Sequence, residues 1–142
     1  MRRGFSLAEL AAVLAIVAVA TAVTLPRLGG LLDWIAVDAA ARDVTTALAV
    51  ARNAAVTRAA PSRLVIAGDT LRIDRWQGDS WGALLRWPGP FARGVALETS
   101  NPIVRFDAVG MGWGVSNTKV VLRRGSRSET LTVSRLGRVK RW

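Results

Sequence analysis

The chain has 142 residues, of which 51% are hydrophobic, and a formal net charge of +10 at pH 7. This apolar content excludes an intrinsically disordered protein, and the length left after the N-terminal apolar run suits one modest globular domain rather than two. Histidine and cysteine are both absent, which removes the usual general base, the thiol nucleophile and the common metal ligands. We therefore expect a protein that is not an enzyme, that has no cofactor or metal site, and whose charge favours anionic partners.

Residues 5–25 form an apolar run whose only polar members are Ser6, Glu9, Thr21 and Thr24. As a helix, this run spans about 30 Å, which is the thickness of the hydrocarbon core of a bilayer. Arg2 and Arg3 precede it, and the positive-inside rule places that end in the cytoplasm. The sequence therefore predicts a single-pass anchor with the remaining chain on the opposite side of the membrane.

A carboxylate lies near the start of this run, at Glu9. A charge inside a spanning helix costs roughly 2.5–3.5 kcal/mol, so it usually has a partner or a function. After the two arginines, Gly4-Phe5-Ser6-Leu7-Ala8-Glu9-Leu10 resembles the class III signal of type IV prepilins and of type II secretion pseudopilins. An ordinary signal anchor with an incidental glutamate fits less well, and so does a cleaved signal peptide, because no small-x-small cleavage site stands out.

This resemblance implies three roles for residues at the start of the chain. A prepilin peptidase would remove the leader 1–4 by cutting between Gly4 and Phe5, and would methylate the new amino terminus at Phe5. Glu9 would pair with the terminal amine of a neighbouring subunit during filament assembly. The implied partners are therefore prepilin peptidase, the inner membrane and other pilin-like subunits that pack through the N-terminal helix.

Pro26 and Gly29-Gly30 follow the apolar run and predict a kink or a brief interruption of the helix. Beyond them, small apolar residues recur with alternating spacings of four and three. This pattern predicts an amphipathic helix within residues 26–60 that ends before Pro61. We favour packing of this stripe on the sheet of its own domain over exposure to an unrelated partner helix. The stripe consists of Val37, Ala41, Val44, Leu48, Ala51 and Ala55.

From Arg63 onward, the hydrophobic pattern changes to a period of two, which predicts short strands separated by turns. We expect strands at residues 64–67, 71–76, 83–87, 95–98, 103–106, 119–123 and 130–133. Pro88-Gly89-Pro90 has the composition of a mobile loop. Gly110-Met111-Gly112-Trp113-Gly114 is a turn rather than a phosphate-binding loop, because it lacks Gly-Lys-Ser/Thr and a following helix. The predicted fold is α+β, with a long N-terminal transmembrane and amphipathic helix packed on an antiparallel β-domain at 61–142.

Two C-terminal motifs narrow the resemblance. Phe106-x-x-x-Gly110 precedes a predicted strand, and Gly137-Arg138-Val139 lies near the last predicted strand. Both resemble the general secretion pathway protein H and FimT family of pilin-like proteins, whereas residues 68–101 indicate only a generic β-domain. The resemblance implies a minor pseudopilin of a type II secretion system. Such a subunit is anchored in the bacterial inner membrane with its C-terminal domain in the periplasm, and it assembles into the pseudopilus that drives protein export, with the exported protein as a possible partner.

The basic C-terminal segment raises an alternative function. Residues 119–142 contain eight Lys or Arg against one acid, Glu129. Some FimT-like pilins are linked to DNA capture through Gly-Arg-x-Arg, and here Lys140 stands in the fourth position, so the charge is kept and the planar fork is lost. The alternative is thus a minor type IV pilin that binds DNA for uptake through Arg138, Lys140 and Arg141, with Trp142 free to stack on a base.

Two further interpretations use no nucleic acid. The basic tail can be a solvated, charged edge strand that hinders aggregation, and we favour this over DNA binding because charge runs alone are weak motifs. The whole chain can also be a plain anchored β-domain that joins no filament.

Overall fold

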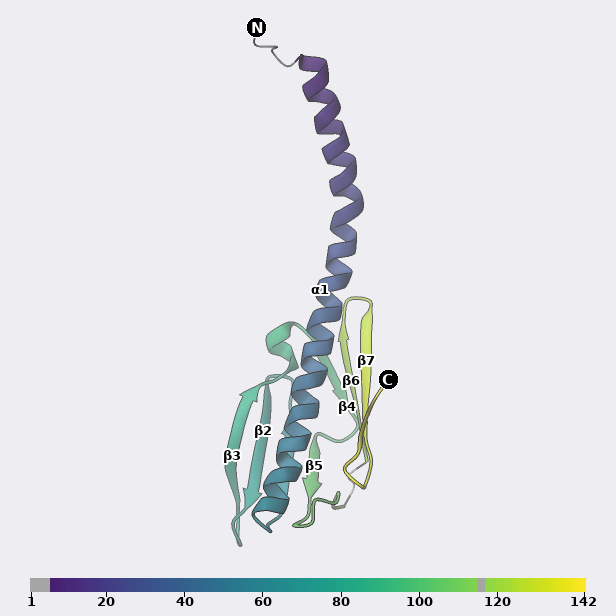
Figure 1. Ribbon diagram of the computed structural model, residues 1–142. Helices are drawn as coiled ribbons and strands as arrows, with labels where there is room; N and C mark the ends of the chain where they lie inside the picture. Colours follow the sequence, from purple (N-terminus) through teal and green to yellow (C-terminus); the bar gives the residue numbers. More distant parts are fainter. Residues whose placement is uncertain (1–5, 115–116) are drawn as a thin grey trace. The chain divides into compact units, whose positions relative to one another are not determined.

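The computed structural model of the chain describes residues 6–114 and 117–142 (Figure 1). The predicted cleavage site, Gly4 and Phe5, lies outside these residues. The chain forms two compact units, Met1–Leu32 and Asp33–Trp142. Helix α1 (Leu7–Thr57) contributes its first part to one unit and its second part to the other.

Among the described residues of the first unit, α1 is an apolar helix whose large apolar side chains are exposed. Among the described residues, α1 is the one helix long and apolar enough to cross a membrane, and its most apolar window buries nothing within the protein. Ser6 begins the helix, because its Oγ accepts a hydrogen bond from the Glu9 N–H at 3.2 Å. The hydroxyls of Thr21 and Thr24 donate to the carbonyls four residues earlier, each at 2.7 Å. The polar groups of the two threonines are therefore satisfied within the helix itself, as an apolar environment requires.

The predicted interruption near Pro26 is wrong, because α1 continues through Pro26, Gly29 and Gly30. The alternative, a kink at this point, stays a prediction. A proline removes one backbone donor from the ladder, and the leucines nearby, such as Leu25 and Leu28, favour the helix. The predicted end before Pro61 is confirmed. The helix stops at Thr57, after which Ala59 adopts a left-handed φ of 46° and the Ala60 N–H donates to the Ala55 carbonyl at 3.2 Å.

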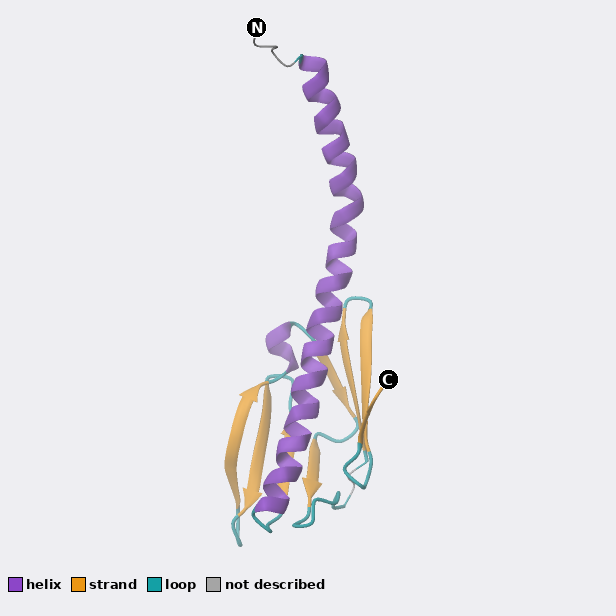
Figure 2. Ribbon diagram, viewed as in Figure 1, coloured by secondary structure: helices purple, strands orange, loops and turns teal. Residues whose placement is uncertain are grey.

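The second unit contains two antiparallel four-stranded sheets (Figure 2). The first sheet has the order β3 (Trp81–Pro88), β2 (Thr70–Trp76), β1 (Ser62–Ile66) and β5 (Ile103–Phe106). The second sheet has the order β4 (Ala96–Thr99), β6 (Thr118–Arg124), β7 (Arg127–Val133) and β8 (Val139–Arg141). All seven predicted strands are present, and β8 is an additional edge strand. The predicted α+β architecture is therefore confirmed.

One hydrophobic core joins the second part of α1 to both sheets. Every residue of the small-residue stripe on the helix is at most 3% exposed. Leu64 and Ile73 of the first sheet and Leu122 and Leu131 of the second sheet belong to the same core. The expectation that the stripe packs on the sheets of its own domain is confirmed.

Two loops tie the sheets together. Pro88-Gly89-Pro90, expected to be mobile, is instead fixed in the fold: Gly89 and Pro90 are buried, and the Gly89 N–H donates to the Asp69 carbonyl at 2.8 Å. A short 3₁₀ helix, η1 (Pro90–Arg93), follows directly. The glycine-rich segment after β5 is a turn, as predicted, and it is held by a bridge between Phe106 and Gly112.

Candidate functional sites

Glu9 lies in the first turn of α1 and is exposed. Its neighbours Leu10 and Val13 are also exposed, at 54% and 48%. The ion pairs found among the described residues do not include Glu9. A carboxylate on an exposed apolar helix calls for a cation from outside the helix, because apolar surroundings do not solvate its charge.

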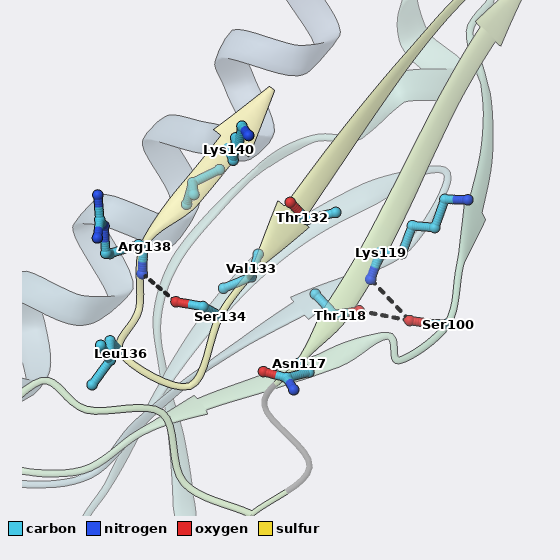
Figure 3. A pocket seen from close by; sticks show the side chains of 11 residues that line it. Ser100, Asn117, Thr118, Lys119, Thr132, Val133, Ser134, Leu136, Arg138 and Lys140 are labelled. Atoms are coloured by element: carbon cyan, nitrogen blue, oxygen red, sulfur yellow. Dashed lines mark hydrogen bonds between the residues drawn. The ribbon is translucent and has the colours of Figure 1, made fainter. Parts of the chain in front are cut away.

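The basic C-terminal segment lines a hollow of about 990 Å³ beside β6, β7 and β8 (Figure 3). In the register of the second sheet, Lys119 pairs with Thr132, and Thr132 pairs with Lys140. The two lysines are thus separated by one strand, which places their backbones about 10 Å apart. Arg138 also lines the hollow. Three cations from two segments of the sequence therefore share one site.

Backbone hydrogen bonds shape this hollow. The Lys119 N–H donates to the Ser100 Oγ at 2.9 Å. The turn before β8 is closed by the Ser134 N–H, which donates to the Arg138 carbonyl at 2.9 Å, while the Arg138 N–H donates to the Ser134 Oγ at 3.3 Å. Gly137 has a φ of 70° in this turn, a conformation that side chains with a Cβ rarely adopt. The turn thus fixes the backbone position of Arg138.

Arg141 takes a different role from Arg138 and Lys140. Its Nη2 donates to Asp38 Oδ1 on α1 at 2.6 Å, and its Nε pairs with Glu129. The hydrogen bond from Arg141 is the main reason why the pKa of Asp38 lies below its usual value of 3.8. The two carboxylates also raise the pKa of Arg141 above its usual value. Arg141 is therefore engaged within the protein.

The alternation of side chains along a strand explains this separation. Arg141 pairs in register with the buried Leu131, whereas Lys140 pairs with Thr132 on the other face. Trp142 lies on the same face as Lys140, and the Lys140 Nζ is 3.5 Å from the centroid of its ring. The indole N–H of Trp142 donates to the Thr132 Oγ1 at 3.3 Å, and the residue is 68% exposed. Lys140 and Arg141 thus lie on opposite faces of β8, whereas Arg138 precedes the strand.

A second hollow brings together residues that the sequence analysis did not single out. It is lined by Pro61, Trp76, Trp81, Arg105 and Trp113. Its one sequence signal is the pair of tryptophans five positions apart on either side of a hairpin turn. Pro61, Arg105 and Trp113 come from other segments, which periodicity alone does not connect.

Comparisons with known proteins agree on the fold. The family model described as type II transport protein GspH matches residues 40–137. Two crystal structures of the type IV minor pilin FimU from Pseudomonas aeruginosa PAO1 are similar. The first has a TM-score of 0.63 at 18% sequence identity, and the match covers 73% of this chain and 86% of the FimU chain. The second has a TM-score of 0.61 at 17% sequence identity, and the match covers 74% of this chain and 91% of the FimU chain. No curated protein matches the sequence.

Proposed function

Since the chain belongs to the family of type II transport protein GspH, we propose that it is a minor pseudopilin of a type II secretion system. Its work is mechanical: it assembles with other pilin-like subunits into a periplasmic pseudopilus whose extension drives protein export. The observation that carries this proposal is the combination of that family with one exposed apolar helix of membrane length.

The exposed helix supports assembly through α1. Large apolar side chains such as Leu14, Ile16 and Val19 are 61–69% exposed, so this surface needs either lipid or the helices of other subunits around it. In the bilayer, lipid covers the helix. In a filament, neighbouring copies of the same kind of helix replace the lipid.

Glu9 provides the contact between neighbouring subunits in this assembly. Cleavage after Gly4 would create an ammonium group on Phe5, four residues before Glu9. A neighbouring subunit would place its terminal ammonium against the Glu9 carboxylate, and the pair would offset the cost of burying both charges. Arg2 and Arg3 orient the β-domain toward the periplasm before this step.

Complementation tests the proposal in cells that lack the protein. The full chain should restore both the release of exported proteins into the medium and its own recovery in sheared pseudopili. Glu9→Ala should still lose residues 1–4, as mass spectrometry of the N-terminus would show, but its recovery in pseudopili should fall at least tenfold. Glu98→Ala is the matched control, because Glu98 is an exposed acid on β4, and it should behave as the wild type.

Normal export together with a loss of surface pili in the deletion strain would overturn the secretion role and assign the chain to a pilus. Normal recovery of Glu9→Ala in pseudopili would remove the role of Glu9. An unprocessed N-terminus would favour a plain anchored domain over either filament.

A second candidate function is DNA binding by a minor type IV pilin that takes part in DNA uptake. It is favoured by the gathering of Lys119, Arg138 and Lys140 around one hollow. These cations suit a phosphate backbone, and the exposed ring of Trp142 next to Lys140 adds a surface for base stacking. Arg141, which holds Asp38 and Glu129, is assigned to folding rather than to DNA in this candidate.

The test is the affinity of the full chain, in detergent, for duplex DNA over a range of salt concentrations. Changing Arg138 and Lys140 to Gln should lower the salt slope by about 0.9 for each phosphate contact removed. The control changes Arg75 and Arg86 on the first sheet, which matches the charge. Equal losses in both variants would mean that binding follows net charge alone, and this candidate would be rejected.

A further inference from the structure

A tryptophan-lined hollow of about 340 Å³ lies at the first sheet, apart from the basic hollow. Its walls come from five segments: Pro61 before β1, Trp76 at the end of β2, Trp81 at the start of β3, Arg105 in β5, and Trp113 in the turn after β5. Trp113 is 57% exposed. Trp76 and Trp81 are half-buried. Three indoles that converge from separate segments around one opening mark a binding surface, because large apolar groups are usually buried or scattered singly.

The walls of this hollow are fixed by contacts within the protein. Trp76 and Trp81 are register partners whose ring centroids lie 5.3 Å apart, edge to face at 64°. The backbone N–H of Trp76 donates to the Pro61 carbonyl at 2.8 Å, and the backbone N–H of Trp113 donates to the Arg105 carbonyl at 3.0 Å. A preformed site loses little conformational entropy when it binds a ligand.

The charge around the hollow favours an anion. Arg63 lies directly opposite Arg105 in register, and like charges at such positions destabilise a sheet. Asp74 neutralises Arg63 at 2.8 Å but also pairs with Arg72 at 2.9 Å. Arg105 has no ion pair among the described residues. Asp74 is thus shared by Arg63 and Arg72. The positive charge of Arg105 is not balanced by a carboxylate among the described residues.

The lining of the hollow is mostly apolar, and its one charged side chain, Arg105, carries only donors. A suitable ligand must supply acceptors together with a flat apolar face. The volume is near the lower end for ligand pockets, so it accommodates one ring rather than an extended peptide. We propose that this hollow binds a carboxylate-bearing pyranose ring, a uronic-acid residue within a polysaccharide.

In this complex, the C–H face of the sugar packs against the indole of Trp113. The carboxylate accepts two parallel hydrogen bonds from the Arg105 guanidinium, which suits its planar fork. This site does not depend on whether the chain joins a secretion pseudopilus or a pilus.

The test uses the full chain in a detergent without a sugar headgroup, titrated with trigalacturonate and followed by tryptophan fluorescence and calorimetry. Trp113→Ala and Arg105→Gln should each weaken binding at least tenfold, and Arg105→Lys should fall between Arg105→Gln and the wild type. Trp142→Ala and Arg127→Gln are controls on the second sheet and should bind as the wild type does. Neutral galactotriose should bind at least tenfold more weakly than trigalacturonate.

Circular dichroism and a thermal melt establish that each variant folds, so a lost affinity reports on the site. The proposal is overturned if trigalacturonate does not bind, or if the controls lose as much affinity as Trp113→Ala. Equal affinity for galacturonate alone would overturn the polysaccharide as its source. Binding of an acidic proline-rich peptide in place of the sugar, through the same residues, would make the hollow a peptide site instead.

Discussion

Arg141, the penultimate residue, donates a hydrogen bond to Asp38 on α1 at 2.6 Å, across 103 positions of the sequence. Two other carboxylates of the helix make similar contacts: Asp33 pairs with Arg124 of β6 at 3.0 Å, and Asp43 pairs with Arg93 of η1 at 2.9 Å. Successive acids are five residues apart, so each is turned about 140° around the helix from the one before. The helix is thereby held by cations from three different segments.

The Asp38 pair predicts how stability depends on pH. The pKa of Asp38 in the folded protein lies below its usual 3.8, chiefly because of the hydrogen bond from Arg141. The folded state therefore binds this proton less readily than the unfolded state does. The stabilisation is fully present above about pH 4 and is lost as the pH falls through the lowered pKa.

Urea unfolding of the wild type and of Asp38→Asn at pH 7, 5, 4 and 3 measures this effect. The difference in free energy of unfolding between them should be largest at pH 7 and 5 and should shrink at pH 3. Asp69→Asn changes an exposed acid in a turn, and its difference from the wild type should stay constant. A constant difference for Asp38→Asn as well would show that Arg141 does not set the pKa of Asp38.

The different contacts of Arg141 and Arg138 predict unequal effects of the two residues on the free energy of unfolding. Arg141→Gln removes two ion pairs from a side chain that is 38% exposed, and solvent-screened pairs contribute at most about 1 kcal/mol each. We expect a loss of about 1 kcal/mol in the free energy of unfolding. Arg138→Gln alters an exposed cation that has no ion pair among the described residues, and it should change stability by no more than about 0.5 kcal/mol. Chemical denaturation measures both, and a larger loss in Arg138→Gln would contradict the assignment.

Local patterns predicted much of this fold. The strands of residues 71–76 and 103–106 alternate clearly because one face of each is buried, and the helix stripe repeats because it packs on two sheets. The period-two pattern missed β8, since three residues with a single apolar member, Val139, are too short to show a period, and only the charge of the tail indicated an edge strand there. The uninterrupted helix at Pro26 shows that a proline followed by two glycines does not by itself end a helix.

The candidate sites were harder to predict, because they depend on tertiary register. Arg138, Lys140 and Arg141 are close in sequence and were grouped by charge, yet strand alternation turns Arg141 toward Asp38. Lys119 joins Lys140 only through the pairing of both with Thr132. Charge counts reveal a basic segment, but they do not show which cations are already neutralised within the fold.

The buried face of α1, which includes Ala47 beside the stripe, predicts that a larger side chain there is destabilising. Ala47 is fully buried against the core, whereas Ala49, two positions later, is exposed. Ala47→Leu adds volume to a packed interior and should lower the free energy of unfolding by roughly 1–3 kcal/mol. Ala49→Leu is the control and should change it by no more than about 0.5 kcal/mol. Equal thermal midpoints for the two variants would mean that the helix does not pack closely on the sheets.

A final prediction concerns the close approach of backbone at Gly89. A Cβ at this position would lie 2.5 Å from the Gly68 carbonyl oxygen and 2.5 Å from the Thr70 nitrogen. Its φ of −83° is open to any residue, so the obstacle is the lack of space rather than the backbone conformation. Gly89→Ala should force the segment outward, weaken the hydrogen bond to Asp69, and cost about 3 kcal/mol, the upper end of the usual range for overpacking.

Gly82→Ala is the matched control for Gly89→Ala on the same hairpin. Its added Cβ would meet the side chain of Gln77, which is exposed and flexible and can move aside at little cost. We therefore expect a thermal midpoint close to that of the wild type for Gly82→Ala, and a midpoint lower by several degrees for Gly89→Ala. If Gly89→Ala melted at the wild-type temperature, the connection from β3 to η1 would be looser than the burial of Gly89 and Pro90 indicates. The loop would then have the mobility that its composition predicts.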